Sequence, residues 1–134
     1  MAYFETKYGD YLYMIFRIGI GALFLILGVM KLFGLWGMPG GPAKFGTLIW
    51  YAGIFEIMIG LSMTTGVLVR LASAFGIIMM IVAYYIGHVK VGGWNPAVNF
   101  GMPALVFMLA FLVTLAFGAR KASLEKAILG KEFF

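Results

Sequence analysis

The chain has no cysteine and very little charge. Only 11% of its 134 residues are Asp, Glu, Lys or Arg, whereas soluble domains carry about 25%. Without cysteine there is no disulfide, thiolate metal site, iron–sulfur cluster or dithiol redox pair. The single histidine excludes a haem held by two histidines of one chain. Because 63% of the residues are hydrophobic, the composition also excludes a soluble enzyme, a disordered tail and a nucleic-acid-binding module.

These proportions predict an all-α integral membrane protein, with residues 1–134 forming one domain. The net charge of +5 is then explained by Lys and Arg at the ends of spans, so we expect lipid and no nucleic acid as partner. We also expect no cleaved signal peptide. The apolar run after Asp10 is too long for a signal-peptide core of about 7–15 residues.

Four segments are long and apolar enough to cross a bilayer, which takes about 20 residues in a helix. They cover residues 11–35, 47–67, 71–89 and 97–119. Breakers rich in Gly and Pro separate the first span from the second and the third from the fourth. The sequence therefore predicts a four-transmembrane-helix bundle. Its basic tail, in which Ser123 precedes Leu124 and Glu125, predicts a short amphipathic C-terminal helix at the membrane surface.

The distribution of basic residues predicts the orientation of this bundle. An even number of spans puts both termini on one side, and that side carries most of the basic residues. They are Lys7, Arg17, Arg70, Arg120, Lys121, Lys126 and Lys131, against Lys31, Lys44 and Lys90 on the other side. We therefore expect both termini on the cytoplasmic side of a multi-pass protein in the plasma or inner membrane.

Ionisable residues at membrane depth are the first candidates for function. Glu56 lies near the middle of the second span, and Arg17 lies inside the first. We expect the two side chains to pair, because an isolated carboxylate is costly there. Two interpretations of the pair stay open. It either takes part in catalysis, or it only fixes the helix register.

One face of the first span carries Arg17, Gly21, Phe24, Gly28 and Lys31, at alternating spacings of four and three. At 3.6 residues per turn this set forms a single stripe. We expect the stripe to meet the second span, with Lys31 near the outer end as a ligand-binding candidate.

Three further candidates lie near the outer end of the third and fourth spans. His88 follows Tyr84 by one turn, and Asn99 lies near the start of the fourth span. A lone histidine is a poor metal site, so we expect no metal. His88 is suited to exchanging a proton or bonding a quinone carbonyl. The alternatives are an interfacial histidine in an aromatic belt and, for Asn99, a helix cap.

Several short motifs, in order, resemble the DoxX family of small four-span membrane proteins. The resemblance rests on Arg17 followed by a Gly-rich segment ending in Gly28 and Lys31–Leu32, and on Glu56 followed by Gly60. It continues with Arg70–Leu71–Ala72, Asn99–Phe100–Gly101, Gly118 and Ser123–Leu124–Glu125. Met102 stands near where the family has an acidic residue. The resemblance covers residues 11–126.

This resemblance implies a small membrane subunit linked to quinone redox chemistry in a respiratory or oxidase-type complex, similar to thiosulfate:quinone oxidoreductase. Glu56 and Arg17 are then the catalytic candidates. Lys31, Tyr84, His88 and Asn99 are the quinone-binding candidates. No covalently bound cofactor is expected, and the electron carrier is quinone or belongs to a partner.

Two other functions stay open. One is a non-catalytic accessory subunit that packs on a larger respiratory complex. As partners we expect other membrane-protein subunits or further copies of this chain in a homo-oligomer. A small proton-coupled transporter that uses Glu56 is a third, less favoured interpretation, because a permanently paired carboxylate is a poor proton-cycling site.

Overall fold

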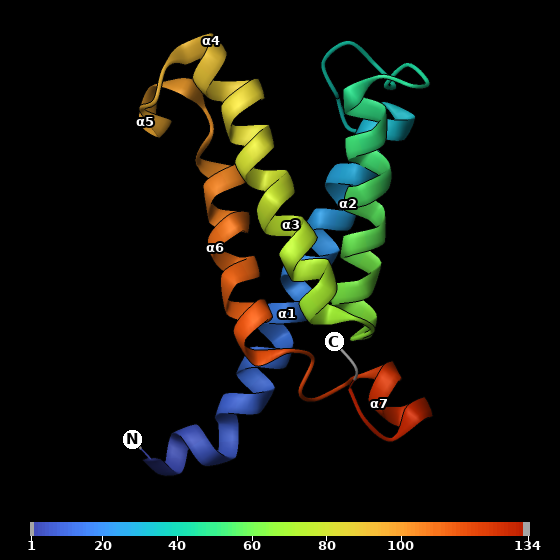
Figure 1. Cartoon of the computed structure of the whole chain (residues 1–134), viewed down its shortest axis with the longest axis vertical. Helices are drawn as coiled ribbons and strands as arrows, with labels where there is room; N and C mark the ends of the chain where they lie inside the picture. The colour runs from blue at the N-terminus through green and yellow to red at the C-terminus, as the bar shows by residue number, and fades with distance from the viewer. Residues whose placement is uncertain (1, 133–134) are drawn as a thin grey trace.

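A computed structural model describes residues 2–132, and every regular element found there is helical. Four long helices are α1 (Ala2–Phe33), α2 (Leu48–Thr65), α3 (Val69–Tyr84) and α6 (Met102–Phe117). Shorter elements are the π-helix η1 (Tyr85–Val89), α4 (Lys90–Gly92), α5 (Pro96–Asn99) and α7 (Leu124–Leu129). The start of α1 and helix α7 lie at one end of the molecule, called here the α7 end (Figure 1). The loop before α2 lies at the opposite end with α4 and α5, called here the loop end (Figure 1).

Three helical segments within the described residues are long and apolar enough to cross a membrane. They are Tyr8–Phe33, Leu48–Thr65 and Val69–Gly92. The apolar helix α6 is shorter, with 16 residues, or about 24 Å at 1.5 Å per residue. The all-helical membrane fold is therefore confirmed. Three of the described helical segments are long enough to cross a membrane.

The expected fourth span over 97–119 is interrupted. Phe100 adopts a left-handed conformation with φ of 58°, which ends α5, and Pro103 lies in the first turn of α6. A proline has no N–H to donate, so it suits a helix start and cannot continue a preceding helix. Residues 96–99 thus form a separate turn of helix at the loop end.

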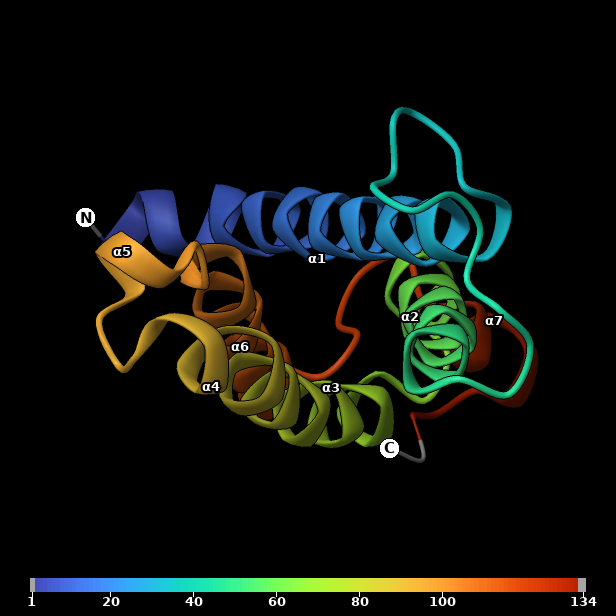
Figure 2. The ribbon, with the colours of Figure 1, turned by 90° about the horizontal axis from the view of Figure 1, so that it is seen from above.

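The helices pack as two pairs, α1 with α2 and α3 with α6. Viewed from above, α1 runs obliquely past α6 and then past α2 (Figure 2). Phe24 of α1 is fully buried and joins the pairs, with its ring centroid 5.0 Å from that of Phe107 and 4.9 Å from that of Phe111. In the second pair the buried Ser73 and Thr114 hydroxyls are 2.7 Å apart.

Glycines set the distance and register of α1 against α2. A Cβ on Gly28 would lie 2.6 Å from the carbonyl oxygen of Gly53, and a Cβ on Gly60 would lie 2.8 Å from that of Gly21. The glycines of each helix are seven residues apart, so two glycine contacts align in one antiparallel register. The predicted contact of the first span's stripe with the second span is confirmed at Arg17, Gly21, Gly28 and Lys31. Phe24 of the same stripe packs against α6 instead.

This close approach predicts that Gly28→Ala destabilises the protein. The added methyl must push α1 and α2 apart, and overpacking of this kind costs about 1–3 kcal/mol. The matched control is Gly19→Ala on the same helix, where a Cβ would meet nothing within 4 Å. Thermal unfolding in detergent should show a lower midpoint for Gly28→Ala than for Gly19→Ala, and equal midpoints would contradict the glycine contact.

Candidate functional site

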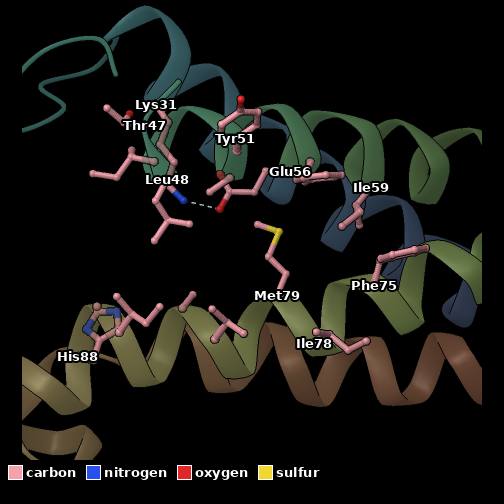
Figure 3. A pocket seen from close by; sticks show the side chains of 17 residues that line it. Lys31, Thr47, Leu48, Tyr51, Glu56, Ile59, Phe75, Ile78, Met79 and His88 are labelled. Carbon is pink, nitrogen blue, oxygen red and sulfur yellow. Dashed lines mark hydrogen bonds and ion pairs between the residues drawn. The ribbon is translucent and has the colours of Figure 1, made fainter. Parts of the chain in front are cut away.

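A cavity of about 790 Å³ lies between α2 and the helix formed by α3 and η1. Each of its two walls follows one face of a helix, where lining residues recur at every turn (Figure 3). The first wall comprises Thr47, Leu48, Ile49, Tyr51, Ala52, Phe55, Glu56 and Ile59, with Lys31 reaching in from α1. The second comprises Phe75, Ile78, Met79, Val82, Ala83, Ile86, Gly87 and His88.

Most of this lining is apolar, and the volume lies within the range of about 300–1,000 Å³ that small-molecule sites occupy. The ionisable lining groups are few: Lys31, Tyr51, Glu56 and His88. An apolar cavity with a small number of polar groups is the usual form of a ligand site, because apolar walls supply affinity and polar atoms supply orientation.

Glu56 forms an ion pair with Lys31 on the cavity wall (Figure 3). Its side chain is 1% exposed and that of Lys31 is 25% exposed. The ammonium contacts Oε1, whereas Oε2 is buried without a hydrogen-bond partner. Buried polar atoms are nearly always bonded, so this carboxylate oxygen is an exception, and protein atoms enclose it.

The predicted ion pair between Arg17 and Glu56 is wrong. Arg17 is fully buried, but its guanidinium donates to three backbone carbonyls. These acceptors are Met63 near the end of α2, Lys121 at 2.9 Å and Ala122 at 2.8 Å. Arg17 therefore fastens α1 to the end of α2 and to the segment before α7, and it does not line the cavity.

The register and the direction of side chains explain this difference. In the glycine register, Glu56 lies eight residues along α2 from the level of Arg17, about 12 Å. Side chains on a helix lean toward its N-terminus, so Arg17 and Glu56 lean apart. Lys31 is six residues from the level of Glu56, and these two side chains lean toward each other.

Two further side chains at the α7 end hold the C-terminal segment against the turn between α2 and α3. Ser123 donates to the carbonyl oxygen of Gly66 at 2.8 Å, and the Glu125 carboxylate accepts from the backbone N–H of Leu68 at 3.1 Å. The Ser123 hydroxyl also accepts from the N–H of Lys126, which confirms it as the cap of the predicted C-terminal helix.

His88 reaches the cavity because the helix changes its pitch. His88 comes nine residues after Met79, which on an uninterrupted α-helix would place it about 180° around the axis. Both residues nevertheless line the cavity. Residues 85–89 form a π-helix, and a π-turn holds one more residue than an α-turn. This extra residue rotates the following part of the helix.

Tyr84 and Asn99 do not line the cavity but support His88. The Asn99 carbonyl oxygen is 2.9 Å from Nδ1 of His88, and the Tyr84 ring is stacked on the imidazole with centroids 6.2 Å apart. The Asn99 amide donates to Gly93 at 2.8 Å, and the Tyr84 hydroxyl donates to Trp94 at 2.6 Å. Asn95, not Asn99, caps α5.

The apolar walls of the cavity were not predicted from the sequence. Phe55 and Ile59 follow Leu48 and Tyr51 along one stripe of α2 that includes Glu56, and Phe75 begins the facing stripe of α3. The matching seven-residue glycine spacings in the two spans were the signal that would have set the register and placed Lys31 beside Glu56.

Comparisons with known proteins support the family resemblance seen in the sequence. The sequence model of the DoxX family matches residues 12–89, more than half of the chain. An uncharacterized protein of Haemophilus influenzae is 29% identical over 129 residues, which cover 93% of this chain and 96% of that protein. No solved structure matches the chain.

The ion pair predicts unequal costs for removing its two partners. Lys31→Met leaves a buried carboxylate without its cation and should destabilise the protein by about 3 kcal/mol. Glu56→Gln should cost less, since the amide oxygen still accepts from Lys31. The double variant K31M/E56Q should recover part of the loss of Lys31→Met.

Thermal unfolding in detergent checks this order, with Lys44→Met at an exposed position of the loop as the control for losing one positive charge. If Lys31→Met unfolds at the same temperature as Lys44→Met, the ion pair does not form.

Proposed function

The chain belongs to the DoxX family, and on this premise we propose that it is a multi-pass membrane protein linked to quinone redox chemistry. The family match over residues 12–89 confirms the membership, and the apolar helices support contact with a lipid bilayer. The proposed site is the cavity between α2 and α3, where a quinone headgroup would lie against the ion pair of Lys31 and Glu56.

One observation carries this proposal. Between helical segments long and apolar enough to cross a membrane, the described part of the chain has a largely apolar cavity with an ion pair on its wall. A quinone combines an apolar ring and chain with polar oxygens, so the apolar walls and the ion pair suit its two parts. Ionisable groups held in such a place are functional by default.

The residues divide into two roles under this proposal. Lys31, Glu56 and His88 line the cavity and would bond the ligand and exchange protons with it. Tyr84 and Asn99 position His88. The Arg17 guanidinium donates to three backbone carbonyls, so we assign Arg17 to holding the helices together.

The charge of the cavity argues against an anionic substrate. The positive charge of Lys31 is compensated by Glu56, so the site has no surplus cation to attract thiosulfate. We therefore propose that the electron donor or acceptor reacts elsewhere, in a partner subunit. Because the chain has no cysteine and one histidine, a partner would also hold any iron–sulfur cluster or bis-histidine haem.

We further propose that α6 is the fourth crossing. It contains no charged residue, and both the start of α1 and helix α7 lie at one end (Figure 1), as an even number of crossings requires. The α7 end carries Arg70, Arg120, Lys121 and Lys126, which by the positive-inside rule faces the cytoplasm of a plasma or inner membrane.

Blocking the cavity tests the site. Tagged protein extracted from its native membranes in mild detergent should retain quinone, identified by mass spectrometry. Ala52→Phe fills the cavity wall and should lower the retained quinone at least about tenfold, since a blocked pocket loses most apolar contacts with its ligand.

The control, Leu23→Phe, changes an exposed position of α1 outside the cavity and should retain as much quinone as the unchanged protein. Equal retention by the Ala52→Phe variant would contradict the site, and unchanged protein free of quinone would contradict the function.

A further inference from the structure

Helix α7 is bonded to the end of the bundle in one orientation. Ser123 and Glu125 contact the backbone of the turn between α2 and α3, and the buried Arg17 donates to two carbonyls of the segment that precedes α7. Because α2 and α3 belong to segments long and apolar enough to cross a membrane, these bonds place α7 where the two segments end. They also decide which face of α7 is turned toward the bundle.

The apolar side chains of α7 lie on the face that is turned toward the bundle. Glu125 points to the turn between α2 and α3, since it is 5% exposed and its carboxylate accepts from a backbone N–H of that turn. At about 100° per residue, Leu129 lies about 40° and Ile128 about 60° from Glu125 around the helix axis. Leu124 lies about 100° away, whereas Ala127 lies on the opposite face. The apolar side chains are therefore directed toward the membrane and away from the water.

The described residues leave this apolar face uncovered. Ile128 is 77% exposed, Leu129 57% and Leu124 50%. Viewed from above, α7 projects past α2 on the side away from α6 (Figure 2), so the space over this face lies beside a membrane-crossing helix and outside the bundle. Lipid occupies that space. An apolar face in this place meets the boundary between headgroups and acyl chains.

Basic residues surround α7. Lys121 precedes it, Lys126 lies within it and Lys131 follows it. Residues 120–132 contain four basic and two acidic side chains, and Glu125, one of the two acidic ones, is buried against the turn between α2 and α3. The exposed surface around α7 is therefore positive, and positive charge beside a bilayer attracts the phosphate groups of anionic lipids.

We propose that α7 binds the interface of a leaflet that contains anionic phospholipid. Leu124, Ile128 and Leu129 enter between the lipid chains, and Lys121 and Lys126 attract the phosphates of headgroups such as phosphatidylglycerol. A helix at the membrane surface is predicted from the sequence, whereas the face that enters the bilayer follows from the contacts of α7. Since α7 is bonded to the turn between α2 and α3, the leaflet then fixes the depth of this end of the bundle, whatever ligand the cavity holds.

Single spin labels test the orientation of α7, because the chain has no cysteine of its own. Leu129→Cys and Ala127→Cys place a label at two exposed positions, about 160° apart around the helix. In nanodiscs of phosphatidylcholine and phosphatidylglycerol, power-saturation EPR compares collisions with oxygen, which concentrates among lipid chains, and with a water-soluble nickel chelate. The Leu129→Cys label should have the higher ratio of oxygen to nickel collisions, and equal or reversed ratios would overturn the proposal.

A lipid titration tests the role of charge. The protein in detergent is titrated with dioleoylphosphatidylglycerol and, separately, with dioleoylphosphatidylcholine, and bound lipid is measured by native mass spectrometry. One lysine near an anionic leaflet contributes about fivefold in affinity, so the unchanged protein should bind the anionic lipid at least about fivefold more tightly. The double variant K121Q/K126Q should lower this ratio of dissociation constants.

The matched control, K44Q/K90Q, removes two positive charges at the loop end. The Lys90 ammonium lies 5.5 Å from the ring centroid of Tyr85, and that of Lys121 lies 3.9 Å from the ring centroid of Tyr11, so each double variant loses one such contact. The ratio should fall less in the control than in K121Q/K126Q. Equal effects of the two double variants, or equal binding of both lipids by the unchanged protein, would contradict the role of charge and with it the proposal.

Discussion

The close antiparallel contact of α1 with α2 is the constraint on which the site depends. Gly28 against Gly53 and Gly21 against Gly60 allow the two backbones to touch, and two equal glycine spacings admit one register. In that register the side chain of Lys31 leans toward Glu56. Any other register would leave a carboxylate in the middle of an apolar helix without a cation, which is costly in the low dielectric of a membrane.

In the same register, the backbone contacts of Arg17 and the cavity lie toward opposite ends of α1. At the α7 end, the buried Arg17 binds carbonyl groups of α2 and of the C-terminal segment, and that end is closed. At the other, α3 with α6 diverges from α1 with α2 (Figure 1), and the cavity lies between α2 and α3. The π-helix of residues 85–89 then turns His88 into this space. One end therefore holds the helices together, and the other contains the cavity.

The family, the helical membrane fold and the stripe of α1 that meets α2 could be predicted from the sequence, because composition and 3.6-residue periodicity determine them. The partner of Glu56 could not be predicted from depth alone, since it depends on the direction in which side chains lean on antiparallel helices. The break at Phe100 depends on a single left-handed residue, which hydropathy does not register. Likewise, a π-helix leaves no simple trace in sequence. The sequence therefore marks His88, Tyr84 and Asn99 as candidates but does not show that only His88 lines the cavity while the other two contact its ring.

The central claim is that the cavity between α2 and α3 holds the ligand, and photo-crosslinking locates a ligand directly. Protein in nanodiscs is irradiated with an azido-quinone, digested, and the labelled peptides are sequenced by mass spectrometry, with excess decylubiquinol as competitor. The account predicts competed labels in residues 47–59 and 75–88, the two walls of the cavity. Labels confined to the lipid-facing side of α6, or labels that the competitor does not reduce, would contradict it.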